Sequence, residues 1–472
     1  MKKILALFLS VLLLFGIVAT VSSGEFASNL LSGGSWLWSH IHSGELPTAD
    51  DFSGPAAARA QPPERVEDDA AVAAGVYRRL PVFSPAASEH YPYRAQTLGY
   101  QCLESDAQRA CYRQLEEQVY VVSGRKGENG CFSLGTVVLP GVKLSEGEIR
   151  VALSAFTADH PEIFWLANLF GYAYDDGDTQ VRLYSQLSYS TCADGLSRLE
   201  ETLDAFAQEV PAGLGEFDRE LLAHDWLLSH CAYDDAAVTD NTRWQAFTVY
   251  GALLEGSAVC EGYSRALSLL LSLVDMESTQ VNGVAKDTPH MWNLVMVDGL
   301  WYHLDATWND SDKMRRYDYF NLTDALISAD HTADPPVSTL SEREICGGGG
   351  APSPYNLPLP ASLSLEANYF TREAIEIDSL GAETDAAVIE KLLACARSGE
   401  ESVSFRLGEG LDYHKTIEQL FHRPPYKFSY YAQQVNRQLP MECQLDLSRA
   451  VYAEVEPFRS VTVQLAYHPV VE

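Results

Sequence analysis

Residues 290–308 read HMWNLVMVDGLWYHLDATW, and this stretch decides most of what the sequence predicts about the fold. Asp298-Gly299 is a dipeptide that two-residue β-turns prefer, and apolar runs flank it on both sides. We therefore predict a β-hairpin in which Val297 faces Leu300 across the turn.

The predicted register brings a histidine and a carboxylate together. Counting outward from the turn, Trp292 lies opposite Asp305 and His290 lies opposite Thr307. Because side chains alternate between the two faces of a strand, these four residues share one face. His290 and Asp305 are then diagonal neighbours, roughly 7–8 Å apart at the backbone and within side-chain reach. A slip of one residue would place them on opposite faces.

A cysteine upstream of the hairpin has a setting that suits a nucleophile. Val259-Cys260-Glu261-Gly262-Tyr263 begins an apolar stretch that predicts a helix over 260–275. A thiol in the first turn of a helix lies at the positive end of the helix dipole, which favours the thiolate. The Cys260 backbone N–H is a natural oxyanion donor, and Gly262 lets another backbone or a substrate approach closely.

A thiol, an imidazole and a carboxylate are the components of a cysteine acyl-transfer site. Each residue alone has another interpretation. Cys260 could be a packing residue or a disulfide partner, His290 a core histidine, and Asp305 a turn cap. Their order and the hairpin geometry favour a catalytic site, and a site that binds without turnover remains the alternative.

Several other residues near this stretch are secondary candidates. Tyr250 and Trp244 could donate a hydrogen bond to an oxyanion or pack in the core, and Trp292 could form one wall of the acyl site. His303 lies opposite Leu294 in the hairpin and ranks below His290 as the base. His224 is expected to be a buried helix histidine.

Three segments together, 259–264, 290–293 and 298–308, resemble the bacterial transglutaminase-like superfamily. Upstream, 224–227 and 233–234 also fit, as does 317–322 downstream, so the resemblance covers about residues 196–335. It implies an α+β fold with a papain-like transglutaminase core, in which the helix that carries the cysteine packs on an antiparallel sheet. It also implies that Cys260 is the nucleophile, His290 the base and acid, and Asp305 the residue that orients His290.

The bulk composition limits the partners. The chain has 472 residues, and 65 acidic against 33 basic side chains give a net charge of −32. Such a chain repels phosphate, so nucleic acid is excluded as a partner. Lys2 and Lys3 precede an apolar run over 4–21, which is either a cleaved export signal or a retained anchor. We expect a secreted or cell-surface protein that touches a membrane only through this segment.

The remaining segments divide the chain at changes in composition. Two small mixed α/β domains are expected to flank the catalytic one, and the second could repeat the strand-helix-strand pattern of the first. The expected boundaries are: signal or anchor 1–23, tether 24–75, N-terminal domain 76–195, transglutaminase-like domain 196–335, Gly/Pro linker 336–362, C-terminal domain 363–472.

The nine cysteines are an odd number, so at least one thiol stays unpaired within the chain. If Cys260 is that thiol, the others could form disulfides or remain as buried thiols. No metal-ligand spacing is present, so we expect neither a metal nor a cofactor. The sequence predicts an exported thiol enzyme acting on a peptide or protein substrate, such as a cell-wall peptide. A surface-bound interaction protein with the same fold is the alternative.

Overall fold

The computed structural model describes residues 76–468, except 86–87, 128, 241–242, 312–313, 342–344 and 346–355. The predicted signal or anchor, the tether and part of the Gly/Pro linker lie outside the described residues. The chain divides into two compact units, Met1–Thr307 with Asp324–Leu363, and Trp308–Thr323 with Ser364–Glu472. No helix of the described part is both long and apolar enough to cross a membrane.

The first unit opens with a three-stranded antiparallel sheet in the order β3-β5-β4. The helix α7 begins at a capping box in which Ser145 accepts from the Glu148 backbone and the Glu148 side chain accepts from Ser145, as its sequence predicts. The elements of this region are β1 (Tyr77–Arg79), α5 (Leu98–Gln101), α6 (Asp106–Gln118), β2 (Val121–Ser123), β3 (Phe132–Leu139), α7 (Glu146–Asp159), β4 (Leu166–Asp175) and β5 (Asp178–Ser185).

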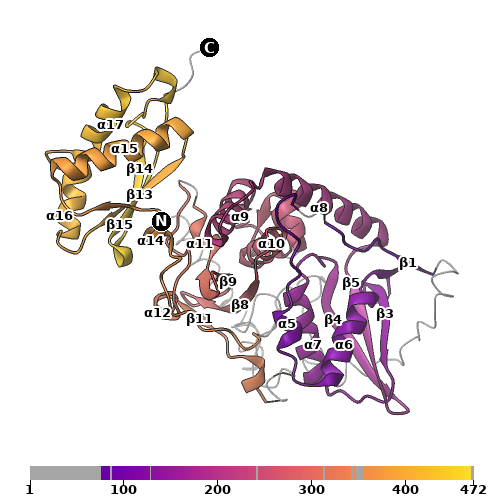
Figure 1. Cartoon of the computed structure of the whole chain (residues 1–472). Coiled ribbons are helices and arrows are strands. Elements are labelled where there is room, and N and C mark those ends of the chain that lie inside the picture. Colours follow the sequence, from indigo (N-terminus) through magenta and orange to yellow (C-terminus); the bar gives the residue numbers. More distant parts are fainter. Residues whose placement is uncertain are drawn as a thin grey trace. The chain divides into compact units, whose positions relative to one another are not determined.

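The long helices α8, α9 and α10 and a second sheet form most of the rest of the first unit (Figure 1). The sheet has the order β10-β9-β8-β11 and is antiparallel throughout. Its elements and their neighbours are α8 (Tyr189–Glu209), α9 (Glu216–His230), β6 (Ala232–Tyr233), η2 (Trp244–Phe247), η3 (Tyr250–Glu255), β7 (Ser257–Ala258), α10 (Cys260–Leu273), β8 (Ser278–Ala285), β9 (Thr288–Val297), β10 (Leu300–Leu304), α11 (Ala306–Asn309), α12 (Asp324–Ile327), β11 (His331–Ala333) and η4 (Val337–Thr339).

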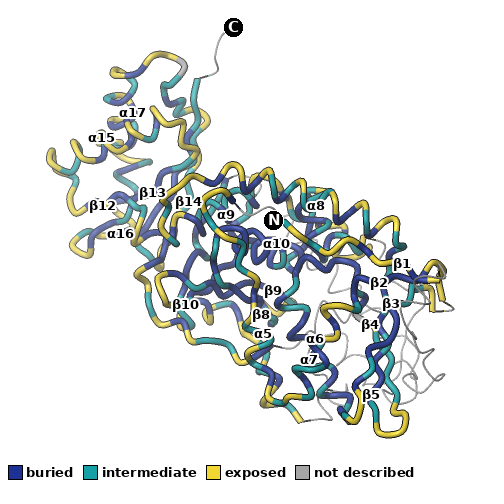
Figure 2. The backbone as a smooth tube through the Cα atoms, turned by 45° about the vertical axis from the view of Figure 1, so that its right-hand side comes forward, coloured by how far each residue is buried: buried dark blue, intermediate teal, exposed yellow. Residues whose placement is uncertain are grey.

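The helix α10 is the centre of this unit, because nearly all of its residues are buried (Figure 2). Polar side chains tie it to the sheet. Asn293 of β9 donates to the Ser264 carbonyl and to the Ser268 hydroxyl, each at 3.0 Å. Gln280 of β8 donates to the same hydroxyl at 2.9 Å. The predicted helix on an antiparallel sheet, and with it the α+β class, is confirmed.

The predicted hairpin register is also confirmed. Leu300 pairs with Val297 and Leu304 with Asn293, which places Asp305 one step further, beside Trp292. The turn residues Asp298 and Gly299 have φ of 51° and 79°, as a two-residue hairpin turn requires. The strand β8, which pairs with β9 along its length, and the short strand β11 beyond it were not predicted.

The N-terminal region packs directly on α10 and β8 of the same unit. Gln96 donates to the Ser272 hydroxyl at 2.8 Å and to the Met276 carbonyl at 3.0 Å, and its oxygen accepts from the Ser278 backbone at 2.8 Å. One buried amide thus satisfies groups at the end of α10 and the start of β8. These bonds fix the end of α10 opposite to the end that carries Cys260.

The second unit contains a mixed sheet in the order β12-β13-β15-β14. The predicted strand-helix-strand order occurs in both regions, as β3-α7-β4 and as β12-α15-β13, but β12 and β13 pair in parallel whereas the N-terminal sheet is antiparallel. The helix α15 starts directly after Gly381, which is its N-cap. The elements are α14 (Tyr369–Arg372), β12 (Ile375–Ile377), α15 (Ala382–Ser398), β13 (Ser402–Leu407), α16 (Tyr413–Ile417), η5 (Glu418–His422), α17 (Lys427–Asn436), η6 (Met441–Cys443), β14 (Val451–Val455), η7 (Glu456–Phe458) and β15 (Ser460–Gln464).

Replacing Gly262 with alanine is expected to destabilise the first unit. A Cβ at this position would lie 2.5 Å from the Ala246 carbonyl oxygen and 2.8 Å from the Ala258 Cβ. Backbone atoms cannot move aside as a flexible side chain can, so we expect a loss of about 1–3 kcal/mol in the free energy of unfolding. Denaturant unfolding measures it. Gly410→Ala is the control, since its Cβ would meet no atom within 4 Å. Equal losses in the two variants would contradict the prediction.

Candidate active site

Cys260 is the first residue of α10, as predicted, and its side chain is half-buried. The preceding Val259 is extended, with φ −95° and ψ −179°, so the chain passes straight from β7 into the helix. The Val259 backbone N–H donates to the Ala246 carbonyl at 2.9 Å, which fixes the helix start against η2. The thiol therefore lies at the N-terminal end of a buried helix, which is the positive end of the helix dipole.

His290 meets both of its predicted partners. Its Nε2 lies 2.7 Å from Asp305 Oδ2, and its ring also hydrogen-bonds the Cys260 side chain. Burial opposes the charged ring, but the Asp305 and Cys260 charges and hydrogen bonds outweigh it and raise the pKa of His290 to about 10. The ring is thus held as an imidazolium between a sulfur and a carboxylate.

Asp305 follows β10 directly and is fully buried. Burial by itself raises the pKa of this carboxyl, but the adjacent His290 and His331 rings lower it below its usual range. The group is therefore a carboxylate inside the protein. Its position orients the His290 ring toward Cys260, which is the arrangement that the hairpin register predicts.

Trp292 and His303 form a separate hydrogen-bonded pair beside the site. The Trp292 indole N–H donates to His303 Nδ1 at 3.0 Å, and His303 Nε2 donates to Asp324 Oδ1 at 2.9 Å. Burial lowers the pKa of His303, so its ring stays neutral. Trp292 is buried and its ring is nearly parallel to the His290 ring at 6.2 Å. Both residues therefore pack and orient the wall beside His290.

The other sequence candidates lie in packed positions. The Tyr250 hydroxyl accepts from Arg198 at 2.9 Å, and its ring contacts Phe164 and Trp244 at centroid distances of 5.3 and 5.6 Å. Gly262 is buried against the Ala246 and Thr248 carbonyls, so a backbone rather than open space occupies the room beside it. His224 is buried in α9 with Nδ1 2.8 Å from Asp225, as expected.

Two residues of the site were missed by the sequence reasoning. His331 Nε2 lies 3.1 Å from Asp305 Oδ2, the same oxygen that binds His290. Tyr233 lies on β6 and pairs with Ala258 of β7. Burial and the nearby Cys260 raise the pKa of the Tyr233 hydroxyl. The sequence feature related to His331 is Gly283. A Cβ added at Gly283 would lie 2.2 Å from the Thr332 carbonyl oxygen, so only glycine lets β11 lie this close to β8.

His290, Asp305 and His331 also offer three metal-ligand atoms that lie within 4.8 Å of one another. The chemistry of this set is suitable for a transition metal. The 2.7 and 3.1 Å contacts to Asp305 are ordinary hydrogen-bond lengths, and hydrogen bonding accounts for the cluster in full. No step of the chemistry below uses a metal.

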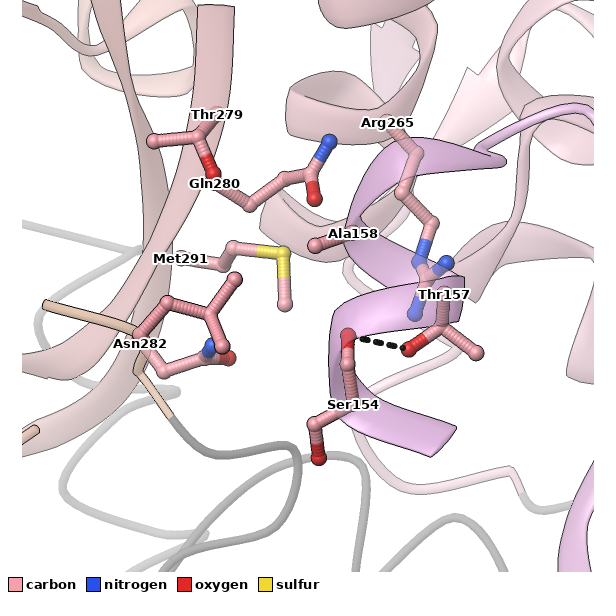
Figure 3. Close-up of a pocket in the computed structure, with 9 residues that line it drawn as sticks. Ser154, Thr157, Ala158, Arg265, Thr279, Gln280, Asn282 and Met291 are labelled. Atoms are coloured by element: carbon pink, nitrogen blue, oxygen red, sulfur yellow. Dashed lines mark hydrogen bonds between the residues drawn. The ribbon is translucent and has the colours of Figure 1, made fainter. Parts of the chain in front are cut away.

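A small open pocket lies between α7, α10 and the β8–β9 strands (Figure 3). Met291 and Asn282 of the strands face Arg265 and Ser154 across it. Met291 follows His290 on β9, so the two side chains leave the strand on opposite faces. None of the three candidate catalytic residues lines this pocket, and it is separate from the acyl site.

The described thiols other than Cys260 are in different surroundings. Every described cysteine is a free thiol, so Cys260 is not part of a disulfide. Burial raises the pKa of Cys111 and Cys192 to about 12. Burial also raises the pKa of three half-buried thiols, Cys102, Cys131 and Cys395. Cys346 lies outside the described residues.

Comparison with known proteins matches the part of the chain that contains these residues. The family model for the transglutaminase-like superfamily matches residues 204–306. The kyphoscoliosis peptidase of Homo sapiens is 30% identical over 134 residues, which are 23% of this chain and 20% of that protein. That of Mus musculus is 29% identical over 137 residues, 24% of this chain and 21% of that protein. The matched region thus spans about a fifth of these relatives.

Among solved structures, one described as a crystal structure of a TGase covers 39% of this chain and 53% of its own. It is 14% identical with a TM-score of 0.24, a likeness too low to support an argument. The family match and the helix-on-sheet core agree with each other, and they indicate the cysteine-dependent class of enzymes. Residues 204–306, which include Cys260, His290 and Asp305, are a domain of the transglutaminase-like superfamily.

Proposed function

We propose that this protein is an exported cysteine-dependent enzyme that attacks amide carbonyls with Cys260. The observation that carries the proposal is the placement of His290, which hydrogen-bonds Cys260 and whose Nε2 is 2.7 Å from the buried Asp305. A buried carboxylate, an imidazole and a thiol in contact are what a thioester-forming enzyme requires.

The reaction follows from these contacts. The Cys260 thiolate adds to the amide carbonyl carbon, and the Cys260 backbone N–H at the start of α10 donates to the developing oxyanion. The His290 imidazolium, whose pKa is raised to about 10, gives its proton to the leaving amine as the carbon–nitrogen bond breaks. Neutral His290 then takes a proton from the water or amine that attacks the thioester, and the carbon–sulfur bond breaks to release the product acid or amide and regenerate the Cys260 thiolate beside the His290 imidazolium.

The nature of the acceptor and the location are part of the proposal. Water as acceptor makes the enzyme a peptidase or amidase, and an amine makes it a cross-linking enzyme. The matched mammalian relatives are named as peptidases, which favours water. Lys2, Lys3 and the apolar run 4–21 support export, so cell-wall peptides and extracellular proteins are the proposed substrates.

Thiol labelling tests the proposed nucleophile. Iodoacetamide at pH 7 should alkylate Cys260 faster than any other cysteine, because the thiolate is the reactive form and burial disfavours it in most of the others. His290→Ala should slow the labelling of Cys260 by about tenfold or more, since the imidazolium that stabilises the thiolate is gone. Peptide mass spectrometry of the intact chain, sampled over time, measures each cysteine separately.

Two results would contradict the proposal that the protein is a cysteine-dependent enzyme. One is equal labelling of Cys260 in the parent and in His290→Ala, and the other is labelling of Cys260 no faster than that of the half-buried Cys131. Either result would favour the interaction protein that uses the same fold. Circular dichroism of His290→Ala establishes that the variant is folded.

A partition experiment distinguishes the two acceptors. The protein is incubated with casein or with purified cell-wall peptides, in each case with and without dansylcadaverine. Hydrolysis gives new peptide termini or ammonia whether or not the amine is present. Transamidation gives a fluorescent product only with the amine. We expect hydrolysis to dominate, and a product that is mainly fluorescent would reverse that assignment while leaving the nucleophile unchanged.

A further inference from the structure

The carboxylate of Asp305 binds a second histidine. His331, at the start of β11, lies 3.1 Å through Nε2 from the Oδ2 atom that also binds His290. His331 and Asp305 are both fully buried. A carboxylate oxygen only accepts hydrogen bonds, so both rings donate to one oxygen from two different strands.

The far side of His331 is fixed as well. Its Nδ1 lies 2.6 Å from Oδ1 of Asp330, the residue before β11. The backbone carbonyl of Asp330 accepts from the Lys286 N–H at 2.9 Å, in the turn between β8 and β9. A continuous set of contacts therefore runs from Cys260 through His290, Asp305 and His331 to Asp330 near the surface.

Packing holds the ring of His331 in this line. The Trp292 ring meets it edge to face with centroids 5.1 Å apart, and the His290 ring does so at 5.4 Å. Gly283 of β8 lets β11 lie close to β8, because a Cβ at position 283 would clash with Thr332 of β11. His331 is thus held by its strand, by a carboxylate and by two rings, and its remaining nitrogen points at Asp305.

We propose that His331 is a positioning residue, which holds the Asp305 carboxylate so that Oδ2 faces His290 and orients that ring toward Cys260. The inference rests on the proposed function of Cys260 and extends it. With two donors on Oδ2 from fixed directions, the carboxylate cannot rotate about its Cβ–Cγ bond without losing a buried hydrogen bond. Outer partners of this kind commonly change the activity of the groups that they orient by about 10–100-fold.

Alkylation of Cys260 by iodoacetamide in the full chain tests the role of His331 without a known substrate. The second-order rate constant is measured from pH 5 to pH 10 for the parent, His331→Ala, His331→Gln and Asp330→Asn. The charged and titratable groups that face the two rings are Cys260, Asp305, Asp330 and His303, with Lys286 beyond Asp330.

We expect His331→Ala to slow the alkylation at pH 7 by about tenfold and to change the shape of the pH profile, because His290 is no longer held against the thiolate. His331→Gln should restore the rate to within about threefold of the parent, since its amide N–H donates to Asp305. The alkylation rate of Asp330→Asn should lie between the rates of His331→Ala and His331→Gln. His224→Ala is the matched control, because His224 is also fully buried and its Nδ1 also lies within hydrogen-bond distance of an aspartate, the adjacent Asp225 of α9. Its rate should equal that of the parent.

A rate for His331→Ala within twofold of the parent would overturn the inference, as would an equal fall in His224→Ala. If His331→Ala does not fold, Asp330→Asn decides, and a rate and pH profile equal to those of the parent in that variant would overturn the inference. The proposed function fails by a different result, which is slow labelling of Cys260 in the parent itself.

Discussion

Replacing Cys260 with alanine is expected to abolish amide turnover, with a loss of about 10⁴-fold or more. The thioester requires a sulfur at the first position of α10, and the described structure places no second thiol in contact with His290. The backbone N–H of residue 260 remains, so binding should survive while the chemistry is lost. Turnover of the casein or cell-wall peptide that the parent accepts measures the effect, and intact-mass spectrometry shows the loss of the trapped acyl-enzyme.

Cys131→Ala is the matched control for this variant. Cys131 is also a half-buried free thiol of the same unit, but burial raises its pKa and it belongs to no hydrogen-bonded set of the site. It should keep the parent rate. Substantial turnover in Cys260→Ala would show that another group forms the covalent bond and would end the proposed mechanism.

Replacing Asp305 with asparagine is expected to lower turnover by about 10³–10⁴-fold. Asparagine keeps an oxygen that accepts from His290 but removes the charge that stabilises the imidazolium. The parent should lose activity only as pH rises through about 10, where His290 gives up the proton that the leaving amine needs. In Asp305→Asn that alkaline limb should move down toward the ordinary histidine value of 6.5. Turnover measured from pH 5 to pH 11 shows both effects.

The same substitution should change stability with a definite pH dependence. The folded pKa of His290 is raised, so its contribution is fully present below 6.5 and is lost as pH rises through about 10. The folded pKa of Asp305 is lowered, so its contribution is present above the ordinary 3.8 and is lost as pH falls further. The loss of melting temperature in Asp305→Asn should therefore be greatest between about pH 4 and 6.5 and should shrink toward pH 10.

Asp324→Asn is the control for Asp305→Asn. Asp324 also accepts from a buried histidine, His303, at 2.9 Å, but the pair lies beside the site rather than in it. The turnover of Asp324→Asn and the alkaline limb of its pH–activity profile should match those of the parent. An unchanged limb in Asp305→Asn would show that Asp305 does not set the protonation of His290.

Local sequence signals predicted most of the elements near the site. The Asp298-Gly299 turn fixed the hairpin register, and the register placed His290 beside Asp305. The apolar run after Cys260 predicted α10 from its first residue. The capping box at Ser145 predicted the start of α7. Each of these signals depends on residues that are close in sequence, where propensity and periodicity act directly.

The misses came from long-range packing. The strand β8 has polar residues on the face toward α10, such as Gln280 and Asn282, so it lacked the alternation that marks a half-buried strand. A three-residue strand such as β11 carries no periodic signal at all.

By itself the sequence placed Cys260 at a helix start and His290 beside Asp305, because a helix start and a tight hairpin are local structures whose register follows from a few residues. The tertiary structure alone decided what surrounds Asp305. His331 reaches it from a strand that pairs with β8 over a close passage at Gly283, and the Asp305 carboxylate binds both rings. That pairing joins segments far apart in the chain, and such contacts are fixed by the packing of the whole unit rather than by local preference.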